Sequence, residues 1–218
     1  MPEYIFNYGC PGMDILVDND LSISNKIMNK YGGVGEKINW DKPFLLMIQH
    51  SVTTSYGEGL KQVNETLYAL KEIPNIQKII LWPNVDAGTD EVSKGLRVFR
   101  EKNKVLPFHF FRNFSPEDYA RVLNNAKCVV GNSSSFIREG SFLGVPAVLV
   151  GDRQEGREHG RNIILSNYNR MDIQSNIESQ LSIGVCKKDH LFGKGKAGVL
   201  IADQLSVIDL NINKRMTY

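Results

Sequence analysis

The sequence predicts an α/β protein of Rossmann-like, three-layer architecture, with a parallel β-sheet between two layers of helices. Two observations predict this fold. From Pro43 onward, short apolar runs alternate with stretches of helical periodicity, which is the pattern of repeated strand–helix–strand units. The first of these runs, Phe44–Ile48, is apolar at every position, as expected for a strand that helices cover on both faces.

Composition narrows the class of protein. A chain of 218 residues with 42% hydrophobic and 23% charged residues has the make-up of a globular protein with a core. The formal net charge of +2 does not favour nucleic acid as a partner. No apolar run approaches the roughly 18 residues of a membrane span, and the N-terminus lacks the features of a signal peptide.

The cysteines indicate a reducing compartment. Cys10, Cys128 and Cys186 are far apart and form no CxxC pair. We therefore expect free thiols and a cytoplasmic location.

The predicted elements follow one another along the chain. Tyr4–Tyr8 is a candidate strand with no partner before it, and the glycine-broken stretch 22–42 is expected to be a surface segment or linker. Further strands are expected at 44–48, 77–82, 105–110, 127–130, 147–150 and 163–165. Helices are expected at 58–72, 89–102, 115–125, from the serine turn to 143, and at 171–182 and 197–211.

Polar segments follow five of the predicted strands. They are His50–Thr54, Pro83–Gly88, Arg112–Phe114, Gly131–Ser135 and Gly151–Arg153. Because ligands of doubly wound sheets bind at the carboxyl ends of the strands, these segments predict one site along that edge.

Each of these side chains also has an interpretation without a ligand. The serines at 133–135 suit phosphate binding at a helix N-terminus, but they also suit a helix cap. Glu139 could accept the hydroxyls of a ribose or be a solvated surface acid. Arg153 could neutralise a diphosphate or pair with a surface acid. His50 could be structural, donate to phosphate, or act in acid–base steps.

Other catalytic signatures are absent from the sequence. It contains no GxxxxGK[ST], GxSxG or HExxH motif. Gly193–Gly198 fits GxGxxG, but it follows a polar stretch instead of a strand, so it is a weak dinucleotide fingerprint. It could attract an anion at the start of the last helix or simply be a solvated helix start.

Six segments of the chain form a set in a fixed order. They are Gly9–Pro11, His50–Thr54, Trp82–Gly88, Gly131–Glu139, Gly144–Pro146 and Gly151–Glu158. Together they resemble the hydrolysing UDP-N-acetylglucosamine 2-epimerases of sialic acid and related nonulosonic acid biosynthesis. The resemblance covers nearly the whole chain, but only the second half of the family's two-domain architecture.

The resemblance implies a fold like the C-terminal domain of a glycosyltransferase-B protein and a division of the chain into three parts. Residues 1–42 would be a remnant of the N-terminal domain, its last strand and helix, plus a linker. Residues 43–205 would form the nucleotide-binding domain, and 206–218 the end of the last helix and a tail.

The resemblance also implies a ligand, UDP or a UDP-sugar, and roles for matching residues. Ser133 and Ser134 would hold the diphosphate, with Arg153 beside it. His50, in a supporting catalytic role, and Asn84 would contact the diphosphate or the sugar.

Two further positions match the family's nucleoside contacts. Glu139 would bind the ribose, and Phe114 would contact the base through its backbone. The family's proposed catalytic carboxylates belong to the half that this chain does not resemble. No metal or other cofactor is implied as required.

The leading hypothesis is the UDP-binding half of an enzyme that converts UDP-N-acetylglucosamine and water into N-acetylmannosamine and UDP, inactive on its own. The alternatives are half of a split glycosyltransferase, a 2-epimerase for a UDP- or GDP-linked diacetamido sugar, and a non-catalytic binding module. Ser51 and Phe136 depart from the family pattern and leave the sugar open. We expect self-association or a complementary N-terminal half as partner, because an unpartnered interface should be partly apolar.

Overall fold

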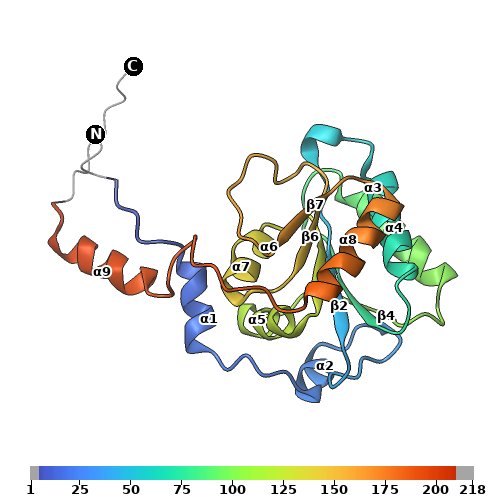
Figure 1. Cartoon of the computed structure of the whole chain (residues 1–218), viewed down its shortest axis with the longest axis horizontal. Helices are drawn as coiled ribbons and strands as arrows, with labels where there is room; N and C mark the ends of the chain where they lie inside the picture. The colour runs from blue at the N-terminus through green and yellow to red at the C-terminus, as the bar shows by residue number, and fades with distance from the viewer. Residues whose placement is uncertain (1–4, 210–218) are drawn as a thin grey trace.

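A seven-stranded sheet forms the centre of the molecule (Figure 1). The computed structural model describes residues 5–209. The strands are β1 (Val34–Gly35), β2 (Phe44–Ile48), β3 (Gln77–Leu81), β4 (Phe108–Phe111), β5 (Cys128–Gly131), β6 (Ala147–Val150) and β7 (Ile163–Ser166). Their order across the sheet is β1-β4-β3-β2-β5-β6-β7, and all neighbours are parallel except β1 and β4. The predicted α/β, Rossmann-like fold is confirmed.

The strand order places a ligand crevice. From β2 the chain adds β3 and β4 on one side, and it then returns to add β5, β6 and β7 on the other side. The order therefore reverses between β2 and β5, and such a switch point opens a crevice at the carboxyl ends of the two strands.

Helices cover both faces of the sheet (Figure 1). One layer is α3 (Gly59–Lys71), α4 (Thr89–Lys102) and α8 (Arg170–Ile183); the other includes α1 (Asp14–Asp18), α2 (Asn25–Tyr31), α5 (Pro116–Asn125), α6 (Ser134–Ile137) and α7 (Glu139–Leu143). Along β2, Leu45 and Met47 pack into the first layer, while Phe44, Leu46 and Ile48 pack into the second. The continuous apolar run therefore serves two cores at once.

The N-terminal strand prediction is wrong for the residues that the structure describes. Tyr4 lies outside them, and Ile5–Tyr8 form no strand, with Ile5 78% exposed. The segment instead runs against the chain near the C-terminal end, where the Cys10 N–H donates to the carbonyl of Phe192 at 2.7 Å. A short segment forms a strand only where a neighbouring strand satisfies its backbone groups.

The stretch 22–42 is not only a linker, since it contains α2 and β1. Asp118 of α5 accepts hydrogen bonds from the Lys30 ammonium at 2.9 Å and the Tyr31 hydroxyl at 2.7 Å, which anchor α2. Both ring nitrogens of His109 lie within 3.0 Å of the carbonyl oxygens of Gly32 and Glu36, beside β1. These contacts depend on residues far along the chain, so local composition does not reveal them.

Three element boundaries also differ from prediction. The strand expected from Val105 begins at Phe108, because Val105 is 91% exposed and outside the sheet. The helix expected after the serine turn is broken at Arg138 into α6 and α7. The last helix, α9 (Ala197–Val207), ends before the expected residue 211, which lies outside the described residues.

The start of α9 already holds an anionic group. Both oxygens of the Asp14 carboxylate accept backbone hydrogen bonds there, from Ala197 at 3.0 Å and Gly198 at 2.7 Å. This contact uses the free N–H groups that an external anion would need. It argues against the anion site considered for Gly193–Gly198, and it ties the two ends of the chain together. No helix among residues 5–209 is both long and apolar enough to cross a membrane.

Replacing Asp14 should loosen α9 selectively. Asp14→Ala removes two charge-assisted bonds to the helix start, a change of the kind that costs about 1 kcal/mol. Amide exchange in residues 197–207 should therefore become about fivefold faster. Asp18→Ala, at an exposed position of α1, is the matched control; equal exchange in the two variants would contradict the capping role.

Candidate functional site

Polar side chains meet where β2 and β5 end. Gly131, the last residue of β5, has a φ of +129°, and a Cβ there would lie 2.0 Å from the carbonyl oxygen of Ile48 in β2. Only glycine permits this close approach of the two backbones. The approach brings Asn132, the residue after β5, into direct contact with His50, the second residue after β2.

Asn132 bonds to the backbone of His50 through its side chain. The Oδ1 atom accepts from the His50 N–H at 2.7 Å, and the Nδ2 group donates to the His50 carbonyl at 2.8 Å. Asn132 is fully buried. The histidine that follows β2 is therefore held by the residue that follows β5.

The imidazole of His50 is held in one tautomer. Its Nδ1 atom accepts a hydrogen bond from the backbone N–H of Asn84 at 3.1 Å, so the ring proton of the neutral form lies on Nε2. Burial lowers the pKa of His50 to about 4; the charge of Arg153 adds to the decrease and Asp86 opposes it. At neutral pH His50 is thus an uncharged hydrogen-bond donor, which favours the phosphate-donor interpretation over an acid–base role.

The loop after β6 brings Arg153 to the same place. Its guanidinium lies 3.4 Å from the Asn132 carbonyl oxygen and 3.4 Å from a carboxylate oxygen of Asp86. Gln154 donates to the same Asn132 carbonyl at 2.9 Å. The loop can turn here because Gly151 has a φ of +76° and lies against the ring of Tyr168, where a Cβ would be 2.1 Å from the ring.

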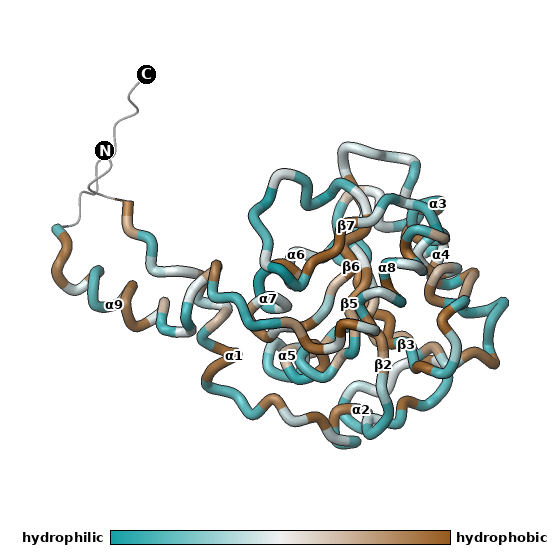
Figure 2. The backbone as a smooth tube through the Cα atoms, in the orientation of Figure 1, coloured by the Kyte–Doolittle hydropathy of each residue, from teal (hydrophilic) through white to brown (hydrophobic). Residues whose placement is uncertain are grey.

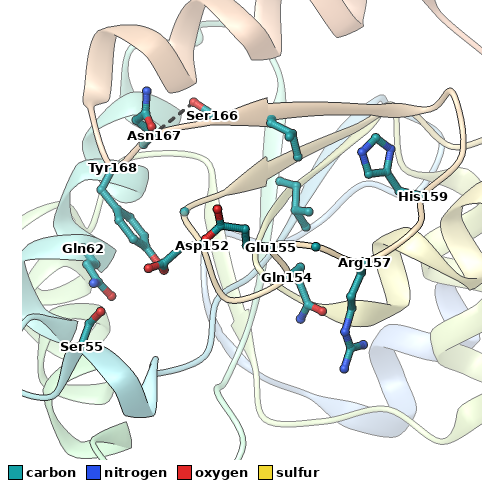
Figure 3. Close-up of a pocket in the computed structure, with 14 residues that line it drawn as sticks. Ser55, Gln62, Asp152, Gln154, Glu155, Arg157, His159, Ser166, Asn167 and Tyr168 are labelled. Carbon is teal, nitrogen blue, oxygen red and sulfur yellow. Dashed lines mark hydrogen bonds between the residues drawn. The ribbon is translucent and has the colours of Figure 1, made fainter.

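Two pockets flank this group of residues. One, of about 670 Å³, is lined by residues 51–54, 85–87 and 152–153, and so contains Arg153 and the neighbours of His50 and Asn84. The other, of about 560 Å³, contains none of the predicted site residues. Figure 3 shows the second pocket, with Tyr168, Gln62 and Ser55 on one side and His159 on the other. We take the first as part of the candidate site because Arg153 lines it; Ser133, Ser134, Glu139 and Phe114 line neither of these two pockets.

The serine turn is both a cap and a hydroxyl chain. Ser133 precedes α6, and its Oγ accepts a hydrogen bond from the Ser135 N–H at 3.4 Å. The Oγ atoms of Ser133 and Ser135 are 2.8 Å apart, and the Tyr119 hydroxyl lies 2.5 Å from the Ser135 Oγ. The capping interpretation is therefore correct for Ser133, and no side-chain hydrogen bond within the described part of the chain occupies the hydroxyl of Ser134.

Glu139 is a half-buried acid with one fully buried oxygen, not a solvated surface acid. Its side chain is 17% exposed; one oxygen is 3.5 Å from the Arg138 guanidinium, and Oε2 is buried with no hydrogen-bond partner among the described residues. Burial raises the pKa of Glu139, and the charge of Arg138 opposes the increase. A buried acceptor without a partner suits a ligand that supplies hydroxyl donors. Gly12 lies against this carboxylate, so the N-terminal segment borders the site.

Phe114 does not present its ring to the crevice. The ring is buried against Phe111 and Tyr31, with ring centroids 4.8 Å apart in each pair. The backbone N–H of Phe114 already donates to the side chain of Asn113 at 2.9 Å. A contact between this residue and a base would therefore use its carbonyl.

Comparison with known proteins places the chain in a family. The model of the UDP-N-acetylglucosamine 2-epimerase family matches residues 1–206. The chain belongs to this family. A UDP-N-acetylglucosamine 2-epimerase of Neisseria meningitidis is 28% identical over 193 residues, which are 88% of this chain and 48% of that protein. A GDP/UDP-N,N'-diacetylbacillosamine 2-epimerase (hydrolyzing) of Campylobacter jejuni is 31% identical over 61% of this chain and 34% of its own length.

Solved structures agree in fold. UDP-GlcNAc 2-epimerase from Methanocaldococcus jannaschii, in complex with UDP-GlcNAc and UDP, superposes with a TM-score of 0.65 at 19% identity, over 94% of this chain and 56% of that one. A UDP co-structure of S. aureus MnaA gives a TM-score of 0.63 at 13% identity, over 91% and 53% of the two chains. The chain spans about half the length of these relatives.

The structure adds residues that sequence reasoning did not select. Asn132, Gln154 and Asp86 connect the loops that carry His50 and Arg153. All three lie in segments that the sequence analysis had already marked. Their importance comes from bonds between loops, which spacing along the chain does not show.

The lowered pKa of His50 should appear as a pH dependence of stability. Between about pH 4 and 6.5 the unfolded chain protonates His50 and the folded chain does not, so the free energy of unfolding rises with pH in this window. Across this window His50 should change the free energy of unfolding by about 3 kcal/mol.

His50→Asn keeps an acceptor for the Asn84 N–H but cannot titrate. Subtracting its pH profile of unfolding free energy, measured with urea, removes the contribution of the carboxylates. Parallel profiles for the two proteins would contradict the assignment of a neutral, buried His50.

Proposed function

We propose that the chain is the C-terminal, UDP-binding half of a hydrolysing UDP-N-acetylglucosamine 2-epimerase. One observation carries the proposal: in a member of this family, the loops of His50, Asn84 and Arg153 are hydrogen-bonded to one another at the switch point of the sheet. This chain matches only about half of the length of these relatives, which supports a division of the site between two halves.

The diphosphate would lie over the ends of β2 and β5. His50 would donate from Nε2, Arg153 would neutralise charge, and the turn of Ser133 and Ser134 would supply a hydroxyl and backbone N–H groups. Asn84 would contact the diphosphate or the sugar while its backbone holds the His50 ring. A neutral histidine suits this role because it can donate without losing a proton.

The nucleoside would extend toward α5 and α7. Glu139 would accept the ribose hydroxyls with its unpartnered oxygen, which would recover the cost of burying that oxygen. Phe114 would meet the base through its carbonyl. UDP is proposed as the nucleotide because the family model and the relatives are named for UDP-sugars.

The reaction would begin with loss of the proton at C2 of the sugar and elimination of UDP across the C1–C2 bond. Water would then add to the resulting glycal and give the 2-epimeric free sugar. The residues of this chain would hold the leaving diphosphate, while the acids and bases that move the C2 proton would lie in the other half. We therefore propose that the chain alone binds UDP without turnover. We also expect it to act in the cytoplasm, since its cysteines are free.

A second candidate has a different sugar and either UDP or GDP as the nucleotide. The Campylobacter relative and one from Legionella pneumophila, 26% identical over 99% of this chain, are both named for N,N'-diacetylbacillosamine. A UDP- or GDP-linked diacetamido sugar is therefore the alternative substrate. Competition among UDP, GDP and both sugar nucleotides for one site would distinguish the two.

Nucleotide binding should depend on Arg153. UDP titrated to millimolar concentration should give a saturable change in tryptophan fluorescence, and Arg153→Ala should weaken binding about 10- to 100-fold, the range for a lost charge-assisted bond. Arg153→Lys should fall between, because it keeps the charge but not the planar fork.

Arg161→Ala is the control, at an exposed position of the same loop, and should bind like the wild type. No saturable response in the wild type would refute the proposed UDP site. Release of the 2-epimeric sugar by the chain alone would refute the division of catalysis.

An apolar surface supports a partner for this half. Helix α9 is set apart from the sheet and its helices in Figure 1, and Figure 2 shows hydrophobic residues along it. Val199 is 66% exposed, Leu205 59% and Val207 77%. We propose that α9 is covered by a complementary N-terminal half or, in its absence, by a second copy of the chain.

Self-association should therefore require the apolar side chains of α9. Size-exclusion chromatography with light scattering should show a mass above 24.6 kDa that increases with concentration. Leu205→Glu should return the chain to a monomer, whereas Asp203→Lys, an equally drastic change at an exposed polar position of the helix, should not. A monomeric wild type at high concentration would refute the second-copy proposal.

A further inference from the structure

Asn132 uses both its backbone and its side chain to join three loops. It is fully buried, and its backbone N–H donates to the Ile48 carbonyl at 3.1 Å. Its side chain bonds to His50, and its own carbonyl accepts from Arg153 and Gln154. A buried amide with this many partners is costly to replace and fixes the geometry of the groups around it.

The Asn132 side chain makes the two hydrogen bonds that a neighbouring strand would otherwise make to the backbone of His50. The pairing of β2 and β5 ends at Ile48 and Gly131. The Asn132 carboxamide, one residue beyond Gly131, pairs with the N–H and carbonyl of His50, two residues beyond Ile48, as a strand backbone would. With the Asn84 N–H on Nδ1, the backbone and the ring of His50 are both held, so the direction of the Nε2–H bond is determined before any ligand arrives.

The backbone carbonyl of Asn132 holds the other loop. Gln154 is buried and donates to it at 2.9 Å, and the Arg153 guanidinium lies 3.4 Å from it. One residue thus sets the position of a neutral donor and of a cation that come from different parts of the chain. Such bonds between supporting and binding residues orient the binding residues.

We propose that Asn132 is a positioning residue of the nucleotide site, which holds the His50 imidazole and the Arg153–Gln154 loop in the arrangement that binds a diphosphate. The inference rests on the proposed function for the ligand. The orientation of His50 itself does not depend on a ligand and can be tested without one.

Asn132→Asp is the primary test because it changes one amide to a carboxylate of the same shape. It keeps an acceptor for the His50 N–H but places an oxygen against the His50 carbonyl, and it adds negative charge below the diphosphate. We expect UDP affinity to fall at least about tenfold. In nitrogen-15 spectra of the imidazoles, the wild type should show His50 protonated on Nε2, and the variant should show a shifted or mixed tautomer.

Two further variants separate positioning from folding. Gln180→Glu makes the same chemical change at another buried amide, which donates to the carbonyls of Ala147 and Asn162 at 2.8 Å near the opposite ends of the strands. It should lower stability and leave both the His50 signals and UDP affinity unchanged. Gln154→Leu removes only the bond from that side chain to the Asn132 carbonyl, and should weaken UDP severalfold without changing the His50 tautomer.

Each result bears on one statement. Unaltered His50 signals and UDP affinity in Asn132→Asp, with lowered stability alone, would overturn the proposal and leave a structural residue. A proton on Nδ1 of His50 in the wild type would also overturn it, even if Asn132→Asp fails to fold. If the wild type shows the expected tautomer but no UDP binding, the proposed function fails, while the positioning of His50 by Asn132 is still supported.

Discussion

The arrangement of the site depends first on the close approach of β5 to β2 at the point where the strand order reverses. Gly131 allows the two backbones to meet, and Asn132 then bonds to His50, two residues beyond the end of the neighbouring strand. A parallel sheet directs the ends of its strands to one edge. The bond between Asn132 and His50 converts that shared edge into a defined arrangement of side chains, and the remaining loops are placed relative to it.

The electrostatics of the site match this arrangement. His50 is neutral because it is buried and lies near Arg153, which forms an ion pair with Asp86. Glu139 carries an oxygen without a partner in the described part of the chain. The site thus presents donors and a cation in one region and an unsatisfied acceptor in another. A ligand with an anionic centre and free hydroxyls would satisfy both at once.

Helix α9 and the segment around Asp14 have a different physical character from the sheet. Asp14 fixes the start of α9, but the rest of that helix exposes apolar side chains and packs little against the core. Several exposed apolar side chains on one helix are typical of a surface that binds another domain or chain. The half-length match to the relatives and this exposed apolar surface are the two observations behind the proposal that a complementary half or a second copy covers α9.

Much of this protein followed from the sequence by itself. Continuous apolar runs between helical stretches determined a sheet covered on both faces, and the polar residues after each strand marked the edge where a site would form. Periodicity and strand ends are local properties, so a single chain shows them. Tertiary structure alone decided the rest: α2 and β1 depend on Asp118 and His109, residues 5–8 form no strand with the described part of the chain, and the tautomer of His50 depends on the Asn84 backbone. These features are set by hydrogen bonds between residues far apart in the chain, whose formation depends on burial and on exact backbone positions, and no spacing along the sequence encodes them.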